Sequence, residues 1–291
     1  MKLLIVNADD LGLSDAINEA VKAGYLSGAV TGVSILACGK CFPGAVRMLR
    51  DIGKPEVGAH LALTGRFAPC TKEQARVRTL TDGAGRLRSG YRAFMGPYFL
   101  GRIGPDEIRL ELSNQIKLIR AEGLTITHLD SHEHVHMLPG ILDIVLGLAE
   151  EFGIPYIRLP RETISVTGKD FSAAALARYC ALRVFTAGSG KLIRAAGIRC
   201  NDAFLGHFHS GRINDDVLCH MLDHLGDGVS ELAVHPGLRS GELAEESPWH
   251  KNAQNELDTL LEGSWRGRAD KSGIRLVSHR EVIEERKGDG S

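Results

Sequence analysis

The sequence predicts an α/β fold, in which a single catalytic domain of residues 1–291 forms a distorted (β/α) barrel. Short apolar runs of strand length alternate with amphipathic segments of helix length along most of the chain. This alternation is typical of a parallel sheet that is buried on both faces. The presence of about seven or eight such units favours a closed or distorted barrel over an open, doubly wound sheet.

The first unit shows both elements. The apolar run KLLIV, residues 2–6, predicts a buried strand. Residues 14–28 predict a helix, because apolar side chains recur at helical spacing and Ser14 can cap the N-terminus. Gly24 or Gly28 can end this helix. The chain therefore begins with a strand–helix pair.

Comparable units follow as far as the C-terminus. Further strand-like runs lie within 32–38, 56–64, 125–136, 154–160, 201–209, 230–237 and 273–285. Helix-like segments lie at 42–53, 106–123, 139–153, 214–226 and 252–263. No G-x-G-x-x-G follows the first strand and no G-x-x-x-x-G-K-[ST] occurs. The main support for a dinucleotide or nucleoside triphosphate site is therefore missing.

Two segments do not fit the repeat. Residues 65–104 are rich in Gly and Arg with interspersed aromatic residues, and residues 161–190 are too long for a simple turn. Long insertions on an α/β scaffold usually build the substrate side of a site. We expect both to shape that side, with a poorly ordered surface loop as the alternative.

Charge and hydropathy exclude several classes of protein. The chain has 35 Lys and Arg against 36 Asp and Glu, so its net charge of -1 provides no overall field that would attract nucleic acid. The N-terminus is charged too early for a signal peptide, and no apolar run reaches the roughly 18 residues of a membrane span. We expect a soluble, cytoplasmic protein that is not integral to the membrane and has no nucleic-acid partner. A monomer and a homodimer both remain open.

The six cysteines are too sparse for a disulfide scaffold, so reduced thiols are expected. Cys38 and Cys41 form a C-x-x-C. A zinc site would need two further ligands at matched spacing, and no second C-x-x-C exists. The two thiols are either a redox or metal pair or simply small residues at a strand-to-helix turn.

The histidines are concentrated where strands end. Four of the twelve lie within nine residues, at His128, His132, His134 and His136, with Asp130 between them. Others close strand-like segments, namely His60, His207, His209 and His235. Ligand-type residues at several strand ends predict a site at the carboxyl face of the barrel. Imidazole and carboxylate groups together favour a divalent metal ion there, although a single histidine can equally be an ordinary buried polar residue.

The first strand ends in two adjacent carboxylates, Asp9 and Asp10. Because neighbouring residues of a strand point to opposite sides, the two cannot easily ligate one ion. One can bind the ion while the other accepts a proton from bound water, and the cation offsets their mutual repulsion. A helix N-cap pair is the alternative. His235, fixed by Pro236, is a candidate general acid.

These motifs resemble a known family. IVNADDLGLS, VGAHLALT, THLDSHEHVHMLP and AVHPG, in this order and along essentially the whole chain, are similar to the YdjC-like carbohydrate deacetylases, which include the chito-oligosaccharide deacetylases. The resemblance implies a distorted barrel of the glycoside hydrolase/deacetylase type. It also implies metal-dependent hydrolysis of an N-acetyl group on an amino sugar, with release of acetate.

The resemblance also implies roles for individual residues. Asp10, His60 and His132 match the family's metal ligands. Asp9 matches its catalytic base and His235 the histidine taken as general acid. Hydrogen bonds that orient the metal ligands, or contacts to the sugar, are then expected from His128, Asp130, His134, His136 and Arg158. Leu11 departs from the aromatic residue that the family usually has after NADD, which affects packing or sugar contact rather than chemistry.

The ion and the substrate stay open at this stage. Two histidines and a carboxylate suit zinc or magnesium best, while manganese, cobalt and nickel also fit. Residues 192–215 resemble members associated with hopanoid biosynthesis, so the substrate is either a chito-oligosaccharide or a lipid-linked N-acetylglucosamine. The alternatives are a metal-dependent hydrolase of another amide or a phosphoester, and a non-catalytic protein that binds a metal or a sugar.

Overall fold

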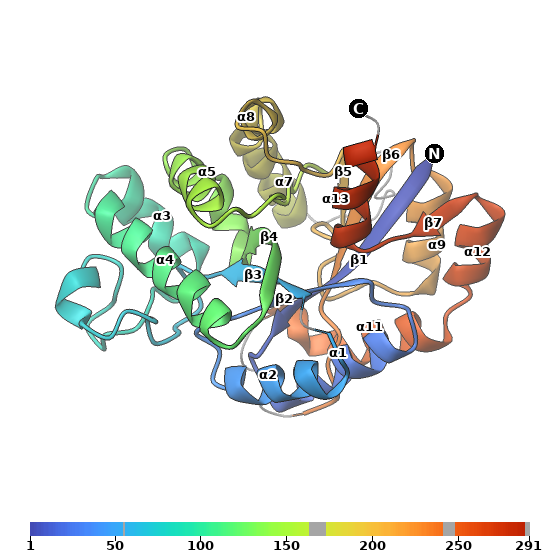
Figure 1. Ribbon diagram of the computed structural model, residues 1–291, viewed down its shortest axis with the longest axis horizontal. Helices are drawn as coiled ribbons and strands as arrows, with labels where there is room; N and C mark the ends of the chain where they lie inside the picture. Colours follow the sequence, from blue (N-terminus) through green and yellow to red (C-terminus); the bar gives the residue numbers. More distant parts are fainter. Residues whose placement is uncertain (55, 163–172, 241–247, 289–291) are drawn as a thin grey trace.

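The computed structural model describes residues 1–54, 56–162, 173–240 and 248–288 (Figure 1). All of its strands pair in parallel within one sheet, in the order β4-β3-β2-β1-β6-β5, and β7 pairs with the first residues of β1. The strands are β1 (Lys2–Leu11), β2 (Gly32–Ile35), β3 (Glu56–Leu61), β4 (Thr125–Ser131), β5 (Ala203–Leu205), β6 (Gly228–Val234) and β7 (Ile274–Leu276).

The sheet curves into a distorted barrel, which confirms the predicted fold class. Segment 154–160, expected as a strand, forms only isolated parallel bridges, and one more follows at Glu162. Ile157 pairs with Leu129 of β4, and Glu162 pairs with Phe204 of β5. Because β4 and β5 are the two edges of the sheet, this irregular segment lies between them and completes the ring of strands.

Helices surround the strands in Figure 1. They are α1 (Asp15–Leu26), α2 (Phe42–Asp51), α3 (Tyr91–Phe99), α4 (Pro105–Ala121), α5 (Ile141–Glu151), α7 (Ala173–Phe185), α8 (Ser189–Ala195), α9 (Asp215–Asp223), α11 (Ala253–Glu262), α12 (Trp265–Lys271) and α13 (His279–Gly288). The first helix begins as predicted, with the Ser14 hydroxyl accepting from the Ile17 amide at 3.2 Å. It ends before Gly28, whose φ of 73° is left-handed.

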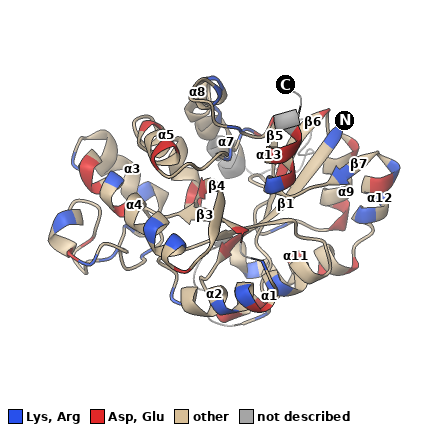
Figure 2. Ribbon diagram, in the orientation of Figure 1, with Lys and Arg blue, Asp and Glu red and all other residues tan. Residues whose placement is uncertain are grey.

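The buried core consists of the apolar strand residues and the inner faces of these helices. Leu4, Val6 and Ile35 are completely buried, as expected for parallel strands covered on both sides. Figure 2 shows Lys, Arg, Asp and Glu of both signs distributed over the outer helices. Among the described residues, no helix is both long enough and apolar enough to cross a bilayer.

The first insertion, 65–104, folds against the carboxyl end of the barrel. It contains a short 3₁₀ turn, η1 (Gln74–Val77), and α3. The Phe67 ring lies 5.5 Å from the ring of His132, and the Tyr91 amide donates to Glu133 at 2.7 Å. In the second insertion, 161–190, α7 is described, whereas residues 163–172 lie outside the described part of the chain.

Candidate active site

Local backbone geometry separates the two carboxylates at the end of β1. The register with β2 shifts between Ala8 and Leu11, and Asp10 has a φ of 62°. A bulge with a left-handed non-glycine residue re-aims a side chain and is strained, and such strain is typical of functional sites. Asp9 and Asp10 are almost completely buried, yet they contact different partners.

Asp10 faces two histidines that come from two other strand ends. His132 Nδ1 lies 2.9 Å from Asp10 Oδ1, and His60 Nε2 lies 3.3 Å from the same oxygen. One ligand atom from each of the three residues lies within 4.8 Å of the others. His60 is the last residue but one of β3, and His132 is the first residue of η2 (His132–Met137), directly after β4. The structure thus brings together three residues that are far apart in sequence.

The other oxygen of Asp10 faces residues that sequence reasoning missed. Trp249 Nε1 donates to Oδ2 at 3.2 Å, and His250 Nε2 lies 3.2 Å from the same oxygen. Both residues belong to η3 (Pro248–Asn252), and the His250 side chain is completely buried. Neither ring nitrogen of His250 makes a hydrogen bond within the described residues. No strand-like run immediately precedes them, so the pattern of strand ends did not point to them.

Asp9 is held by a buried arginine. Arg158 donates from both terminal nitrogens to the two Asp9 oxygens, at 2.6 and 2.7 Å. Its guanidinium also pairs with Asp130 at 2.8 Å and with Glu231 at 2.6 Å, and it is completely buried. Burial is the largest single influence and raises the pKa of the Asp9 carboxyl, but the charge and hydrogen bonds of Arg158, together with His60 and His235, lower it to about 2. Asp9 is therefore ionised at neutral pH.

Asp130 links the two carboxylate environments. It pairs with Arg158, and it also lies 2.9 Å from His60 Nδ1 through its other oxygen. Burial opposes protonation of His60, but the neighbouring carboxylates, Asp130 first among them, raise its pKa to about 10. This local excess of negative charge is an environment that attracts a cation. The contact also directs Nε2 of His60 toward Asp10.

The donor set of Asp10, His60 and His132 fits a divalent metal ion. Two imidazole nitrogens and one carboxylate oxygen, nearly free of solvent contact, are a common protein ligand set for such ions. The Asp130–His60 contact resembles the carboxylate–histidine pairs that orient metal-binding imidazoles. The ion's identity does not follow from these donors.

His235 directly follows β6 and lies near the same group. Its backbone amide donates to Glu256 Oε2 at 2.7 Å, which fixes the strand end against α11. Its ring lies 6.2 Å from the rings of both Trp249 and His250. Burial lowers the pKa of His235 to about 4, although the charges of Asp9 and Asp10 oppose this shift.

The three other histidines of the 128–136 cluster do not join the Asp10 group. His128 lies 3.0 Å from the Ser34 hydroxyl and stacks on His279 at a ring separation of 3.5 Å. His136 bridges the Ser131 hydroxyl and the carbonyl of Arg158. His134 has a φ of 55° and lies 5.3 Å from the His207 ring. Their predicted roles, to contact the sugar or to orient the metal ligands by hydrogen bonds, stay predictions.

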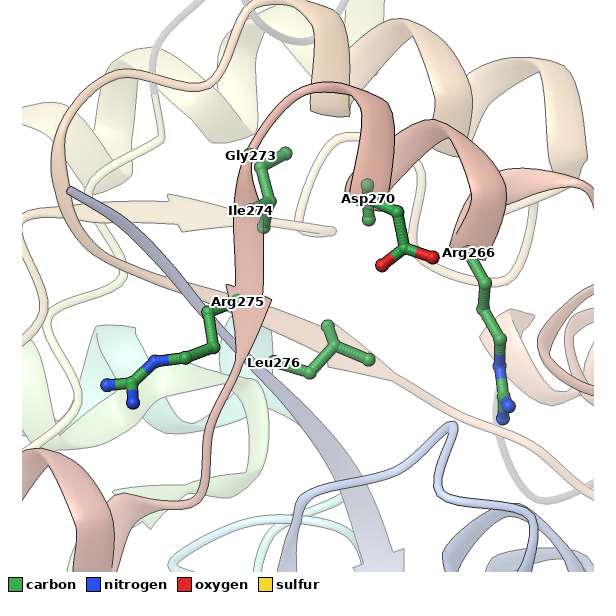
Figure 3. Close-up of a pocket in the computed structure, with 7 residues that line it drawn as sticks. Arg266, Asp270, Gly273, Ile274, Arg275 and Leu276 are labelled. Atoms are coloured by element: carbon green, nitrogen blue, oxygen red, sulfur yellow. The ribbon is translucent and has the colours of Figure 1, made fainter.

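A separate hollow lies at the other end of β1. A cavity of about 460 Å³ lies beside α12 and β7 and is lined by Arg266, Asp270 and Arg275 among others. Figure 3 shows these side chains. Since β7 pairs with Lys2–Leu4, this cavity lies toward the amino end of β1, whereas Asp9 and Asp10 lie at its carboxyl end. The convergent titratable groups, rather than cavity size, therefore identify the candidate site.

Sequence relatives cover almost the full chain. A protein from Brevibacillus brevis named carbohydrate deacetylase is 29% identical over 96% of this chain and 99% of its own length. Relatives of the same name from Thermoanaerobacter pseudethanolicus and Geobacillus stearothermophilus are 26% and 28% identical. They cover 90% and 95% of this chain, and 92% and 96% of their own lengths.

The fold also has a solved counterpart. A crystal structure from Enterococcus faecalis V583, of a protein named for cellobiose-phosphate cleavage, matches with a TM-score of 0.78. It is 23% identical and covers 97% of this chain and 98% of its own chain, so it supports the fold alone. The model of the YdjC-like protein family matches residues 3–270, which confirms the predicted resemblance. The chain therefore belongs to the YdjC-like protein family.

Proposed function

We propose that this protein is a metal-dependent carbohydrate deacetylase that removes the N-acetyl group from an N-acetylglucosamine-containing carbohydrate and releases acetate. One observation carries the proposal: the buried Asp10–His60–His132 group lies one residue from a carboxylate that Arg158 holds ionised. The name shared by the full-length relatives supports the class of substrate.

Asp10, His60 and His132 would hold the ion. When bound, a divalent cation supplies Lewis acidity, which lowers the pKa of water and polarises the acetyl carbonyl. Zinc or magnesium suits the donor set best, with manganese, cobalt and nickel as alternatives. Asp130 and Trp249 support this arrangement. Asp130 contacts Nδ1 of His60 and Trp249 donates to Oδ2 of Asp10, which leaves Nε2 of His60 and Oδ1 of Asp10 to bind the ion.

Asp9 would act as the general base. The bidentate contact with Arg158 fixes its position, and its ionisation leaves it able to take a proton from the attacking water. Its low pKa makes it a weak base in isolation. We therefore expect it to act only on water that is already acidified within the site.

His235 would deliver a proton to the departing sugar amine. The Glu256 contact holds its backbone at the strand end, and its Nδ1 makes no hydrogen bond within the described residues. Its lowered pKa means that the imidazole is neutral before reaction at pH 7. The proton that it delivers would then be the one that Asp9 takes from the attacking water, passed to the imidazole before the amine departs.

The substrate class is tested by acetate release. Purified protein is incubated with N-acetylglucosamine, chitobiose, longer chito-oligosaccharides and a lipid-linked N-acetylglucosamine, with and without a chelator. We expect acetate from at least one substrate, loss of activity with the chelator and recovery on adding metal. Acetate release that is indifferent to the chelator would overturn the metal dependence. No acetate from any sugar, with phosphate or another product released from alternative substrates, would overturn the deacetylase assignment.

A further inference from the structure

Two cysteines from distant parts of the chain meet beside the barrel. Cys38 lies between β2 and α2, and Cys70 lies in the first insertion. Their sulfurs lie within 4.8 Å of each other and of a Glu111 oxygen. Both residues are partly buried and neither is in a disulfide. The C-x-x-C spacing would pair Cys38 with Cys41, but the structure brings Cys70 to it instead.

The acidic neighbour in this cluster is fully engaged. One Glu111 oxygen accepts from the Cys70 amide and from Gln115, at 2.8 and 2.9 Å. The other accepts from the amide and the hydroxyl of Thr71, at 3.0 and 2.6 Å. Four hydrogen bonds fill the usual acceptor sites of a carboxylate. Glu111 therefore serves to fix the Cys70 backbone, and only two donors remain, too few for a stable metal site.

We propose that Cys38 and Cys70 form a site of reversible thiol oxidation, at which a peroxide converts the two thiols into a disulfide. A disulfide needs a sulfur separation of about 2 Å, so its formation requires the two side chains to rotate toward each other. The proposal is independent of the deacetylase assignment, because it concerns residues outside the Asp10 group.

The chemistry assigns different parts to the two sulfurs. The Cys70 thiolate attacks hydrogen peroxide, which breaks the O–O bond, gives a sulfenic acid at Cys70 and releases hydroxide. Cys38 sulfur then attacks the Cys70 sulfur, loses its proton and displaces hydroxide, so the S–S bond forms and water is the second product. The hydrogen bond with Cys70, burial and Glu111 all raise the pKa of Cys38, which suits it as the second reactant rather than the first.

A bond here would tie together two segments that flank the proposed metal ligands. The turn after Cys38 packs tightly on the β1–α1 loop, since a Cβ at Gly39 would lie 2.3 Å from the Gly12 carbonyl oxygen. Cys70 follows Phe67, which contacts the His132 ring. Oxidation therefore restrains the first insertion against the strand end that carries Asp10.

The test is peptide mapping after graded oxidation. The full-length protein is treated with a tenfold excess of hydrogen peroxide, its remaining thiols are alkylated, and it is digested without reductant. We expect a Cys38–Cys70 cross-linked peptide, loss of two alkylatable thiols and a mass decrease of about 2 Da, all reversed by dithiothreitol. The oxidised protein should also unfold at a temperature higher by roughly 5 °C.

Matched serine variants separate this pair from the sequence motif. Cys41→Ser should still form the cross-link, whereas Cys38→Ser and Cys70→Ser should not. A Cys38–Cys41 link, or six thiols that remain alkylatable, would overturn the proposal. The proposal would also be overturned if the wild-type protein bound one equivalent of zinc that both Cys38→Ser and Cys70→Ser lost. The wild-type map alone remains decisive if a variant fails to fold.

Discussion

Two neighbouring residues, Asp9 and Asp10, carry the same charge in different surroundings. Asp9 contacts a permanent cation, because both of its oxygens pair with Arg158. Asp10 contacts His60, His132, Trp249 and His250, none of which has a permanent charge. The raised pKa protonates His60 at neutral pH, and a metal ion that bound there would displace this proton. The protein itself therefore neutralises Asp9. Asp10 is instead surrounded by nitrogen groups, and an added metal ion could bind to its carboxylate alongside them.

This difference explains how adjacent carboxylates can have separate tasks. A buried charge is tolerated only when it is paired, and the two are paired by different means. The Asp9 side is a closed ion-pair network of Arg158, Asp130 and Glu231. The Asp10 side has no permanent cation, and an added metal ion is what we propose pairs with it. Substitutions on each side should therefore affect different quantities.

The largest effect is expected on the Asp9 side. Arg158→Met leaves three buried carboxylates without their cation, so the free energy of unfolding should fall by about 3–5 kcal/mol. Arg109→Met is the matched control, because Arg109 pairs with Glu151 at the surface, and it should cost at most about 1 kcal/mol. Urea unfolding of both variants measures the difference. Equal losses would show that the buried network is not what balances Asp9.

On the Asp10 side the first quantity to change should be metal content. His132→Ala removes a proposed ligand, so the metal affinity should fall by more than the roughly 100-fold that loss of an outer contact costs. Its unfolding transition should remain cooperative. Elemental analysis and calorimetric titration measure the change, with the exposed His224→Ala as control. A His132→Ala protein that keeps one equivalent of metal would contradict the ligand assignment.

Asp9→Asn tests whether the two tasks are separate. Turnover should fall at least about 100-fold, on the scale of a lost acid–base group, while metal content stays unchanged. Acetate release and elemental analysis of the same sample provide both readouts. If this variant lost its metal together with its turnover, Asp9 would contribute to metal binding as Asp10 does. The two carboxylates would then not have separate tasks.

The smallest effect concerns the contact to the second oxygen of Asp10. Trp249→Phe keeps an aromatic ring but removes the Nε1 donor, so the metal affinity should fall about tenfold. Tyr98→Phe removes a phenol hydroxyl that donates to the Pro139 carbonyl, outside the Asp10 group, and it should leave the metal affinity unchanged. Calorimetric titration compares the two. If Trp249→Phe left the metal affinity unchanged, Trp249 would contribute only packing to the site and not its hydrogen bond.

Much of the fold was predictable from the sequence. Apolar runs bounded by helix-capping residues such as Ser14 and Gly28 located most of the strands and helices. The run 273–285 is a strand only in part, because β7 ends at Leu276 and α13 begins at His279. The strand prediction for segment 154–160 was less accurate, because this segment pairs only through isolated bridges where the barrel closes. An irregular strand between two sheet edges has the same amino-acid composition as a regular strand. Its pairing depends only on the strands that pack beside it.

What the sequence by itself determined is which residues could approach one another. Parallel strands end at one face, so Asp10, His60 and His132 converge there whatever the loops do. The tertiary structure alone decided the partners: Arg158 for Asp9, Trp249 and His250 for Asp10, and Cys70 rather than Cys41 for Cys38. These contacts join segments that no periodic pattern relates, because they depend on where an insertion or a turn packs. Spacing along the chain limits local geometry, whereas long-range packing determines which charges and thiols meet.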